Sequence, residues 1–273
     1  MKKIKYFLLF LFPVILFSGC IKVDTTINVK KDGSGTIEET VLISSAVVEM
    51  LKGFMTSFKD STNTEEFKMF KEDEIKSKGS EYGKNVKYVS SEMLKKDGWE
   101  GYKAVYAFED LNTLKMNPNP NDQVPTDMQN KKDSGENGDE EYYFFKFTPG
   151  NVAEITIDRP ELKDETNGET DEDTTATQEN NPMAEKMLEL MKGMSAKINL
   201  KLDGKIVETN ASFVNGSDIT LLNIDFDKLL ENPETLEQLK KHPPKDLEDM
   251  KEISKNIPGI EVELQKPVII KFK

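Results

Sequence analysis

The most constraining feature of the sequence is an alternation of side chains that begins immediately after its single cysteine, Cys20. Over residues 21–29 every second side chain is aliphatic or a threonine, and those between them are polar. This period of two predicts a β-strand with one buried face. Residues 31–35, Lys-Asp-Gly-Ser-Gly, predict a turn, and residues 36–43 predict the second strand of a hairpin. The fold is therefore expected to start directly behind Cys20.

Residues 1–19 have the order of segments found in an export signal. Three lysines precede an apolar run at residues 6–17, which is shorter than the roughly 20 residues that span a bilayer. The following Phe-Ser-Gly-Cys at residues 17–20 resembles a lipobox, at which the signal is cleaved and the cysteine thiol is acylated. We therefore expect residues 1–19 to be a lipoprotein signal peptide and Cys20 to be the lipidated N-terminus.

This signal predicts a location in the bacterial cell envelope, with the N-terminal lipid as the attachment to a membrane. Ile21 follows the cysteine where an aspartate would, in some double-membrane bacteria, signal retention in the inner membrane. The outer membrane is therefore favoured over the outer face of the inner or cytoplasmic membrane.

The acidic charge of the chain is concentrated in two segments. The formal net charge is −13, and residues 116–141 and 159–181 hold most of the excess, with few apolar side chains. Such segments bury too little surface to offset the entropy of ordering them, so we expect two acidic disordered insertions. The remaining chain is expected to form one domain over residues 20–273, or two subdomains at 20–158 and 182–273.

The residue types that the sequence contains exclude several kinds of chemistry. With one cysteine, no intramolecular disulfide can form, and zinc lacks ligands. The only histidine, His242, precedes two prolines and fits an exposed helix end better than a catalytic triad. No basic stripe suits nucleic acid. We expect no metal and no cofactor, although the acidic residues 133–139 weakly resemble a calcium loop.

The rest of the sequence alternates between strand and helix patterns. Helices are expected at residues 45–58, 65–78, 182–194, 227–240 and 244–256, and strands at 85–93, 101–108, 142–147, 152–158, 196–202, 205–213, 217–226 and 267–272. Asp203-Gly204 is expected to join two of these strands as a hairpin. Strands joined by short turns, with helices in blocks, predict an α+β fold with a largely antiparallel sheet and amphipathic helices packed on it.

Two of the expected helices carry apolar stripes that could form a ligand-binding surface. Leu51, Phe54 and Phe58 share one face of the first, and Met187 and Met191 share one face of the third. Methionine stripes occur on adaptable binding surfaces as well as in cores. We therefore treat the five residues as a candidate apolar ligand surface, with packing in the core as the alternative.

Three stretches resemble the LppM-type bacterial lipoproteins. They are GCIKVDTTINVKKDGSG at residues 19–35, GYKAVYAFEDLNTL at 101–114, and LDGKIVETN at 202–210, where Asp203 stands in a position at which proline is common. The resemblance implies an envelope lipoprotein of α+β fold with no established enzymatic activity, for which lipid or partner binding is the usual suggestion. It transfers no catalytic residue.

The residues offer little support for an enzyme. Glu38 and Glu39 are neighbours on a strand and point to opposite faces, so they cannot act on one substrate. Asp225 and Asp227 could share a side, but we expect Asp227 to cap a helix. The favoured function is non-enzymatic binding of a partner protein or an amphipathic ligand such as a lipid. A structural or accessory role in the envelope is the alternative, and an acidic-residue hydrolase is less favoured.

Overall fold

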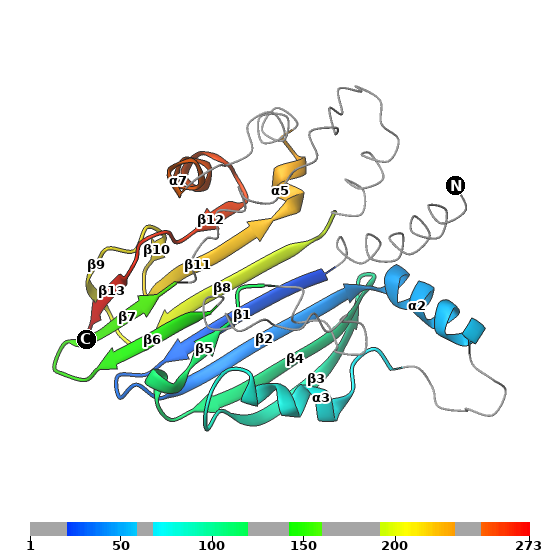
Figure 1. Ribbon diagram of the computed structural model, residues 1–273, viewed down its shortest axis with the longest axis horizontal. Helices are drawn as coiled ribbons and strands as arrows, with labels where there is room; N and C mark the ends of the chain where they lie inside the picture. The colour runs from blue at the N-terminus through cyan, green and yellow to red at the C-terminus, as the bar shows by residue number, and fades with distance from the viewer. Residues whose placement is uncertain (1–20, 59–67, 120–141, 160–191, 233–246) are drawn as a thin grey trace, which may run out of the picture.

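The computed structural model describes residues 21–58, 68–119, 142–159, 192–232 and 247–273, and these segments contain two β-sheets and a few short helices (Figure 1). The first half of the chain contributes β1 (Ile21–Val29), β2 (Gly35–Ser44), α2 (Ser45–Phe58), α3 (Glu72–Ser77), η1 (Lys78–Ser80), β3 (Lys87–Lys96), β4 (Trp99–Phe108), η2 (Leu111–Thr113), β5 (Lys115–Met116), β6 (Tyr143–Thr148) and β7 (Ala153–Asp158). The second half contributes β8 (Ser195–Leu202), β9 (Ile206–Thr209), β10 (Val214–Asn215), β11 (Asp218–Asp225), α5 (Phe226–Leu230), α7 (Leu247–Asn256), β12 (Ile260–Val262) and β13 (Val268–Phe272).

The larger sheet has eight strands, and β1 lies in its middle. Seven strands follow the order β10-β11-β8-β1-β2-β4-β3, and β12 pairs with β11. The smaller sheet has the order β5-β6-β7-β13-β9. Every pairing between these strands is antiparallel except that of β1 with β8, which is parallel. The predicted hairpin of β1 and β2 is confirmed, with Ile21 opposite Ile43 and Val29 opposite Gly35.

The alternation in β1 reflects the two faces of the larger sheet. All odd-numbered residues from Ile21 to Val29 are buried, and the residues between them are partly or fully exposed. On β4 the aromatic side chains of Tyr102, Tyr106 and Phe108 are likewise buried. These side chains belong to one apolar cluster that also includes strands β6, β7 and β13 of the smaller sheet. The core therefore lies between one face of the larger sheet and the smaller sheet.

One predicted hairpin is wrong. Strands β8 and β9 do not pair, because β8 lies between β1 and β11 whereas β9 pairs with β13 in the smaller sheet. The connection at Asp203-Gly204 instead carries the chain between the sheets. Asp203 N donates to Val29 O of β1 (2.8 Å), and Lys205 exchanges two backbone hydrogen bonds with Lys273. The Asp-Gly pair correctly indicated a change in chain direction. However, β8 pairs with β1 and β9 pairs with β13, and both partners lie far away in the sequence.

Several other predicted elements also need correction. The helix expected at residues 65–78 is formed only at 72–77 in the described part, where Glu72, Asp73 and Glu74 provide negative charge at the helix N-terminus. The strand expected at 205–213 is only four residues long, and β12 was missed. The cap of α5 is Asp225, whose side chain accepts from Lys228 N, while Asp227 accepts from Gly193 N.

In its coarse form the predicted fold class agrees with the structure, which is rich in mainly antiparallel sheet with few and short helices in the described segments. Strands from residues 21–158 and from 192–273 pair with each other in both sheets. A boundary between two subdomains at this position would therefore cut through both sheets. Most of the expected helix at 182–194 and most of both acidic insertions lie outside the described residues, and the described residues 192–194 are not helical.

The turn between β1 and β2 is a direct contact between the two sheets. Gly33 has a φ of +83°, and a Cβ added to it would lie 2.5 Å from the ring of Phe147 on β6. Gly33 O also accepts from Leu111 N at 2.9 Å. By comparison, Gly98 in the β3–β4 turn has a φ of +80°, but an added Cβ there would meet nothing within 4 Å.

We predict that Gly33→Ala destabilises the protein more than Gly98→Ala. Both substitutions place a side chain in left-handed backbone, which costs about 1–2 kcal/mol. Only Gly33→Ala also forces the two sheets apart at Phe147, which adds roughly 1–3 kcal/mol of overpacking. Urea unfolding of the two variants and the parent protein measures the difference. Equal losses of stability would show that the turn does not pack against Phe147 in solution.

Candidate functional site

Strand β2 carries a carboxylate on its buried face. The alternation that places Ile37 and Val41 in the core also places Glu39 there, and the Glu39 side chain is 0% exposed. Glu39 lies opposite Thr25 on β1 and Ala104 on β4. A carboxylate taken out of water in this way is costly unless charged and hydrogen-bonding groups surround it.

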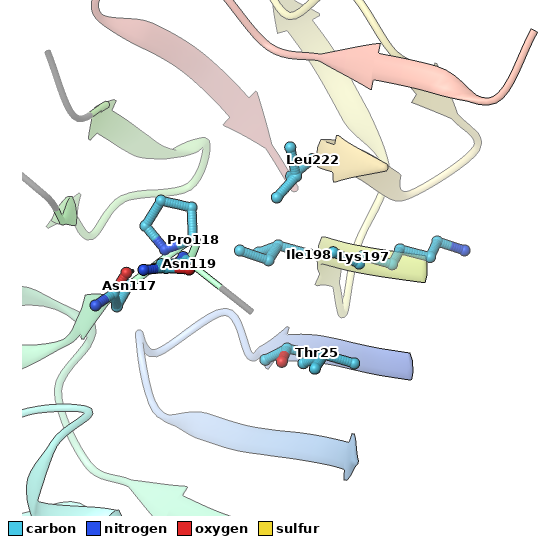
Figure 2. A pocket seen from close by; sticks show the side chains of 9 residues that line it. Thr25, Asn117, Pro118, Asn119, Lys197, Ile198 and Leu222 are labelled. Atoms are coloured by element: carbon cyan, nitrogen blue, oxygen red, sulfur yellow. Dashed lines mark hydrogen bonds between the residues drawn. The ribbon is translucent and has the colours of Figure 1, made fainter. Parts of the chain in front are cut away.

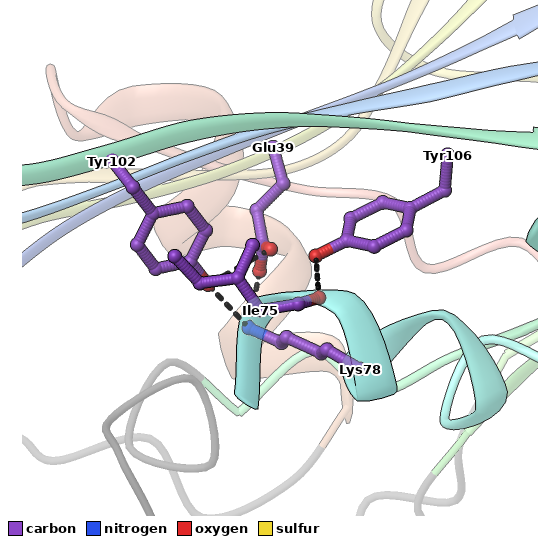
Figure 3. Close-up of polar contacts among 5 residues, drawn as sticks. All are labelled: Glu39, Ile75, Lys78, Tyr102 and Tyr106. Atoms are coloured by element: carbon purple, nitrogen blue, oxygen red, sulfur yellow. Dashed lines mark hydrogen bonds and ion pairs between the residues drawn. The ribbon is translucent and has the colours of Figure 1, made fainter. Parts of the chain in front are cut away.

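Lys78 and Tyr102 supply those groups (Figure 3). Lys78 Nζ lies 2.5 Å from Glu39 Oε1, and the Lys78 side chain is only 10% exposed. Lys78 Nζ also donates to the hydroxyl of Tyr102 at 3.1 Å, and that hydroxyl donates to Glu39 Oε2 at 3.0 Å. The three groups thus form a closed network, in which both carboxylate oxygens accept a hydrogen bond.

The segment that carries Lys78 is positioned by a short helix. Helix α3 and the turn η1 lie beside β3 and β4, and Tyr106 on β4 donates to Ile75 O at 2.8 Å (Figure 3). Ile75 is itself buried, which directs this side of α3 into the core. The hydroxyls of Ser77 and Ser80 donate to carbonyl groups three residues earlier, which closes the ends of the two turns.

Burial and the Glu39 charge act together on the tyrosines near this network. Burial first, and then the negative charge of Glu39, raise the pKa of Tyr82, Tyr102 and Tyr106 above the usual tyrosine value. The Tyr82 hydroxyl is buried without a hydrogen-bond partner among the described residues, and its ring lies 5.3 Å from that of Tyr106. All three phenols are therefore held in the neutral form.

Chemically, the arrangement is a structural ion pair rather than an exposed reactive group. A lysine, a carboxylate and a phenol in contact can exchange protons, but Glu39, Lys78 and Tyr102 are all buried and their hydrogen bonds are directed at one another. Their direct effect is to tie α3 and η1 to the middle of the larger sheet. Replacing one of the three side chains by an apolar one leaves the other two as buried polar groups with incomplete hydrogen bonding.

A small hollow lies on the same face of the larger sheet (Figure 2). Its free volume is about 10 Å³, roughly the space for one water molecule. Thr25, Ile198 and Leu222 line it from the sheet, and Asn117, Pro118 and Asn119 face them from the segment after β5. Thr25 is paired with Glu39, so the hollow and the ion pair occupy neighbouring parts of the sheet.

Of the predicted apolar ligand surface, one side chain can be placed. Leu51 of α2 is buried at 7% exposure together with Val47 and Val48, as part of the apolar cluster. Phe54 and Phe58 belong to the same helix, but their side chains lie outside the described part. Met187, Met191, Cys20, His242 and residues 133–139 also lie outside it.

Two carboxylates are buried that the sequence analysis did not identify as such. The first, Glu39, could have been found from the alternation of β2, which assigns it to the apolar face. The second, Glu263, is 1% exposed and accepts hydrogen bonds from Ser212 N (2.5 Å), the Ser212 hydroxyl (3.1 Å) and Gln265 N (2.9 Å). Glu263 lies outside any clear strand pattern, so only the three-dimensional contacts show that it is buried.

Polar residues in the stretches 101–114 and 202–210 hold neighbouring strands in place. The Asp110 side chain caps η2, and Asn112 Oδ1 accepts from Phe147 N of β6 at 2.9 Å. Asn210 donates to Pro267 O and accepts from Ile269 N, so it joins β9 to the start of β13. The hydrogen bonds of these side chains therefore join segments that are distant in the sequence.

None of the helices in the described segments is both long and apolar enough to cross a membrane.

Comparison with known proteins gives one distant resemblance to report. No family model matches the chain, and no curated protein matches it by sequence. The folded domain of LppM from Mycobacterium tuberculosis, solved by NMR, is similar over 74% of this chain and 81% of its own length, with 11% sequence identity and a TM-score of 0.30. A likeness this weak assigns neither a family nor a function.

We predict that Lys78→Met destabilises the protein by about 3–5 kcal/mol, because it leaves the Glu39 carboxylate buried without its cation. Lys103→Met is the matched control. It removes an exposed ion pair of 3.2 Å with Glu38, the neighbour of Glu39 on the other face of β2, and should cost much less. The triple variant Glu39→Leu, Lys78→Met and Tyr102→Phe should regain most of the loss. Urea unfolding measures all three, and equal effects of the two lysine variants would contradict a structural role for the buried pair.

The raised tyrosine pKa values predict a loss of stability at alkaline pH. The unfolded chain releases phenol protons above about pH 10 while the folded protein retains them, so the contribution of these tyrosines to stability should be fully present below about pH 10 and fall as the pH rises further. Each retained proton contributes a slope of about 1.4 kcal/mol per pH unit. Urea unfolding between about pH 8 and pH 11 tests this. Tyr102→Phe should reduce the slope, and an unchanged slope would exclude Tyr102 as a source.

Proposed function

We propose that this chain is an exported, lipid-anchored protein of the bacterial envelope, whose domain binds a partner protein or an amphipathic ligand without catalysing a reaction. The observation that carries the proposal is the position of β1. This strand begins at Ile21, the residue directly after the lipobox cysteine, and it is paired on both sides, by β2 and by β8. Acyl chains on Cys20 would therefore hold the middle of the larger sheet close to a bilayer, with almost no tether.

Many exported domains are stabilised by disulfides, which this chain cannot form within itself. The proposal of an exported domain therefore requires a large apolar core. The chain has one cysteine, and the described apolar cluster extends through both sheets, from Ile21 and Val23 to Phe272. Burial of such a cluster provides the main stabilisation of a domain without cross-links. The buried ion pair of Glu39 and Lys78 adds a specific attachment of the segment 72–80 to this core.

The ligand class in the proposal comes from the apolar surfaces near the anchored end. Helix α2 starts at the end of β2 that lies opposite Ile21, and its Met50 side chain is 43% exposed. An apolar helix surface beside a membrane suits an amphipathic ligand or the apolar face of a partner protein. In a double-membrane cell, residue Ile21 favours the outer membrane.

Cys20→Ala tests the anchor. The parent protein should be recovered in the membrane fraction with a mass that shows loss of residues 1–19 and addition of acyl chains. Cys20→Ala should lose the acyl mass and leave the membrane fraction, because the chain has no second cysteine. Ser18→Ala is the control, since it keeps the cysteine and a small residue at the cleavage segment. A Cys20→Ala variant that stays firmly membrane-bound would overturn the proposal.

The binding role is tested on the lipidated protein purified from detergent-solubilised envelope. Mass spectrometry of the eluate should show a lipid or a protein in a reproducible ratio to the chain. Met50→Asp should lower this ratio while leaving the thermal unfolding transition in place, because Met50 is exposed. An eluate that contains the chain alone, with no saturable uptake of envelope lipids, would favour the structural role instead.

A further inference from the structure

We propose that Trp99 and the β3–β4 turn rest on the lipid headgroups of the membrane that carries the N-terminal anchor. This inference depends on the proposed lipidation of Cys20 and adds an orientation to it. The interaction surface is one end of the larger sheet, and its partner is a bilayer surface. The opposite end, with the β1–β2 turn and β9, points away from the membrane.

Strand register places Trp99 at the level where the chain enters β1. Ile21 pairs with Ile43, and Ile43 pairs with Glu100. One residue further toward this end, Ser44 pairs with Trp99. Cys20 also precedes Ile21 by one residue in the sequence, and one strand residue spans about 3.4 Å. Acyl chains that start at Cys20 would therefore enter the bilayer close to the level of the Trp99 backbone.

Other elements end or begin at the same end of the sheet. Strand β8 runs parallel to β1 and starts with Ser195 opposite Lys22. Helix α2 starts with Ser45, whose N donates to Gly98 O in the β3–β4 turn at 2.8 Å. Figure 1 shows α2 and the starts of β1 and β8 toward one end of the molecule, and β9 and β13 toward the other. The nine residues of β1 separate the two ends by roughly 27 Å.

The Trp99 side chain reaches across this end of the sheet. Lys22 Nζ on β1 lies 4.1 Å from the ring centroid of Trp99. In the turn just before β8, the strand next to β1, a Cβ added to Gly193 would lie 2.7 Å from Trp99 Cζ2. The ring therefore extends from β4 over the ends of β2 and β1, and it stays partly exposed. A ring with an apolar body and a polar N–H, paired with a lysine, is typical of the membrane–water interface.

The charges of the turn are nearly balanced, which defines the kind of bilayer. Lys95 lies 2.7 Å from Glu100, and Lys96 lies 3.8 Å from Asp97. The side chains of Lys95 and Lys96 are 71% and 85% exposed, so their ammonium groups can reach phosphates. Because acids offset these lysines, the contact depends mainly on the tryptophan ring. It should form on zwitterionic as well as on anionic bilayers.

Trp99 is the only tryptophan in the chain, so its fluorescence reports this site alone. The mature lipidated protein is reconstituted into phosphatidylcholine vesicles that contain lipids brominated near the headgroup end of the acyl chains. We expect the bromolipid to quench Trp99 emission about twofold or more, since interfacial tryptophan lies at the headgroup level. The vesicles should also protect Trp99 from acrylamide in the aqueous phase.

The control variant carries Trp99→Phe together with Val207→Trp. Val207 is on β9, at the far end of the molecule, and is 45% exposed. Its tryptophan should be quenched by acrylamide and not by the bromolipid. If the mass shows acylated Cys20 but Trp99 behaves like the control, the orientation is wrong while the anchor stands. If Cys20 carries no lipid, the proposed anchor fails, and the orientation fails with it.

Discussion

Strand β1 pairs with β2 along its whole length and with β8 from Lys22 to Val29, and the remaining structure depends on this arrangement. Its antiparallel partner β2 follows directly in the chain, whereas its parallel partner β8 starts at Ser195. A parallel pair needs a long connection, and here that connection includes β2, β3 and β4 of the larger sheet and β5, β6 and β7 of the smaller one. A change in the position of β1 would therefore affect both sheets.

The buried ion pair has a different structural effect from the apolar core. Apolar packing is non-directional and does not specify how the segment 72–80 lies on β4. The hydrogen bonds of Lys78 to Glu39 and Tyr102 select one arrangement, because any other leaves a charge buried without a partner. Glu263 acts similarly on the loop at Ser212. Both carboxylates direct a short loop or turn to one place on the sheets.

The two proposals follow from one geometric relation. A lipid-attachment signal next to a flexible tether would allow the domain any orientation above a membrane. A signal next to the first residue of an interior strand gives one end of the sheet a fixed distance from the bilayer, and the register then assigns Ser44, Trp99 and the β3–β4 turn to that end. Both proposals therefore concern the same end of the larger sheet.

The sequence by itself determined the local elements. Alternation with a period of two identified β1, β2, β4 and the β6–β7 hairpin, because a half-buried strand imposes that period on its own residues. The Phe-Ser-Gly-Cys segment that resembles a lipobox, the single cysteine and the single tryptophan are equally local features of the sequence. Only the tertiary structure decided that β8 pairs with β1 in parallel, that β9 belongs to the smaller sheet, and that Lys78 meets Glu39. Those contacts join residues far apart in the chain. Their energy comes from burial and strand pairing between distant segments, which a local sequence pattern cannot show.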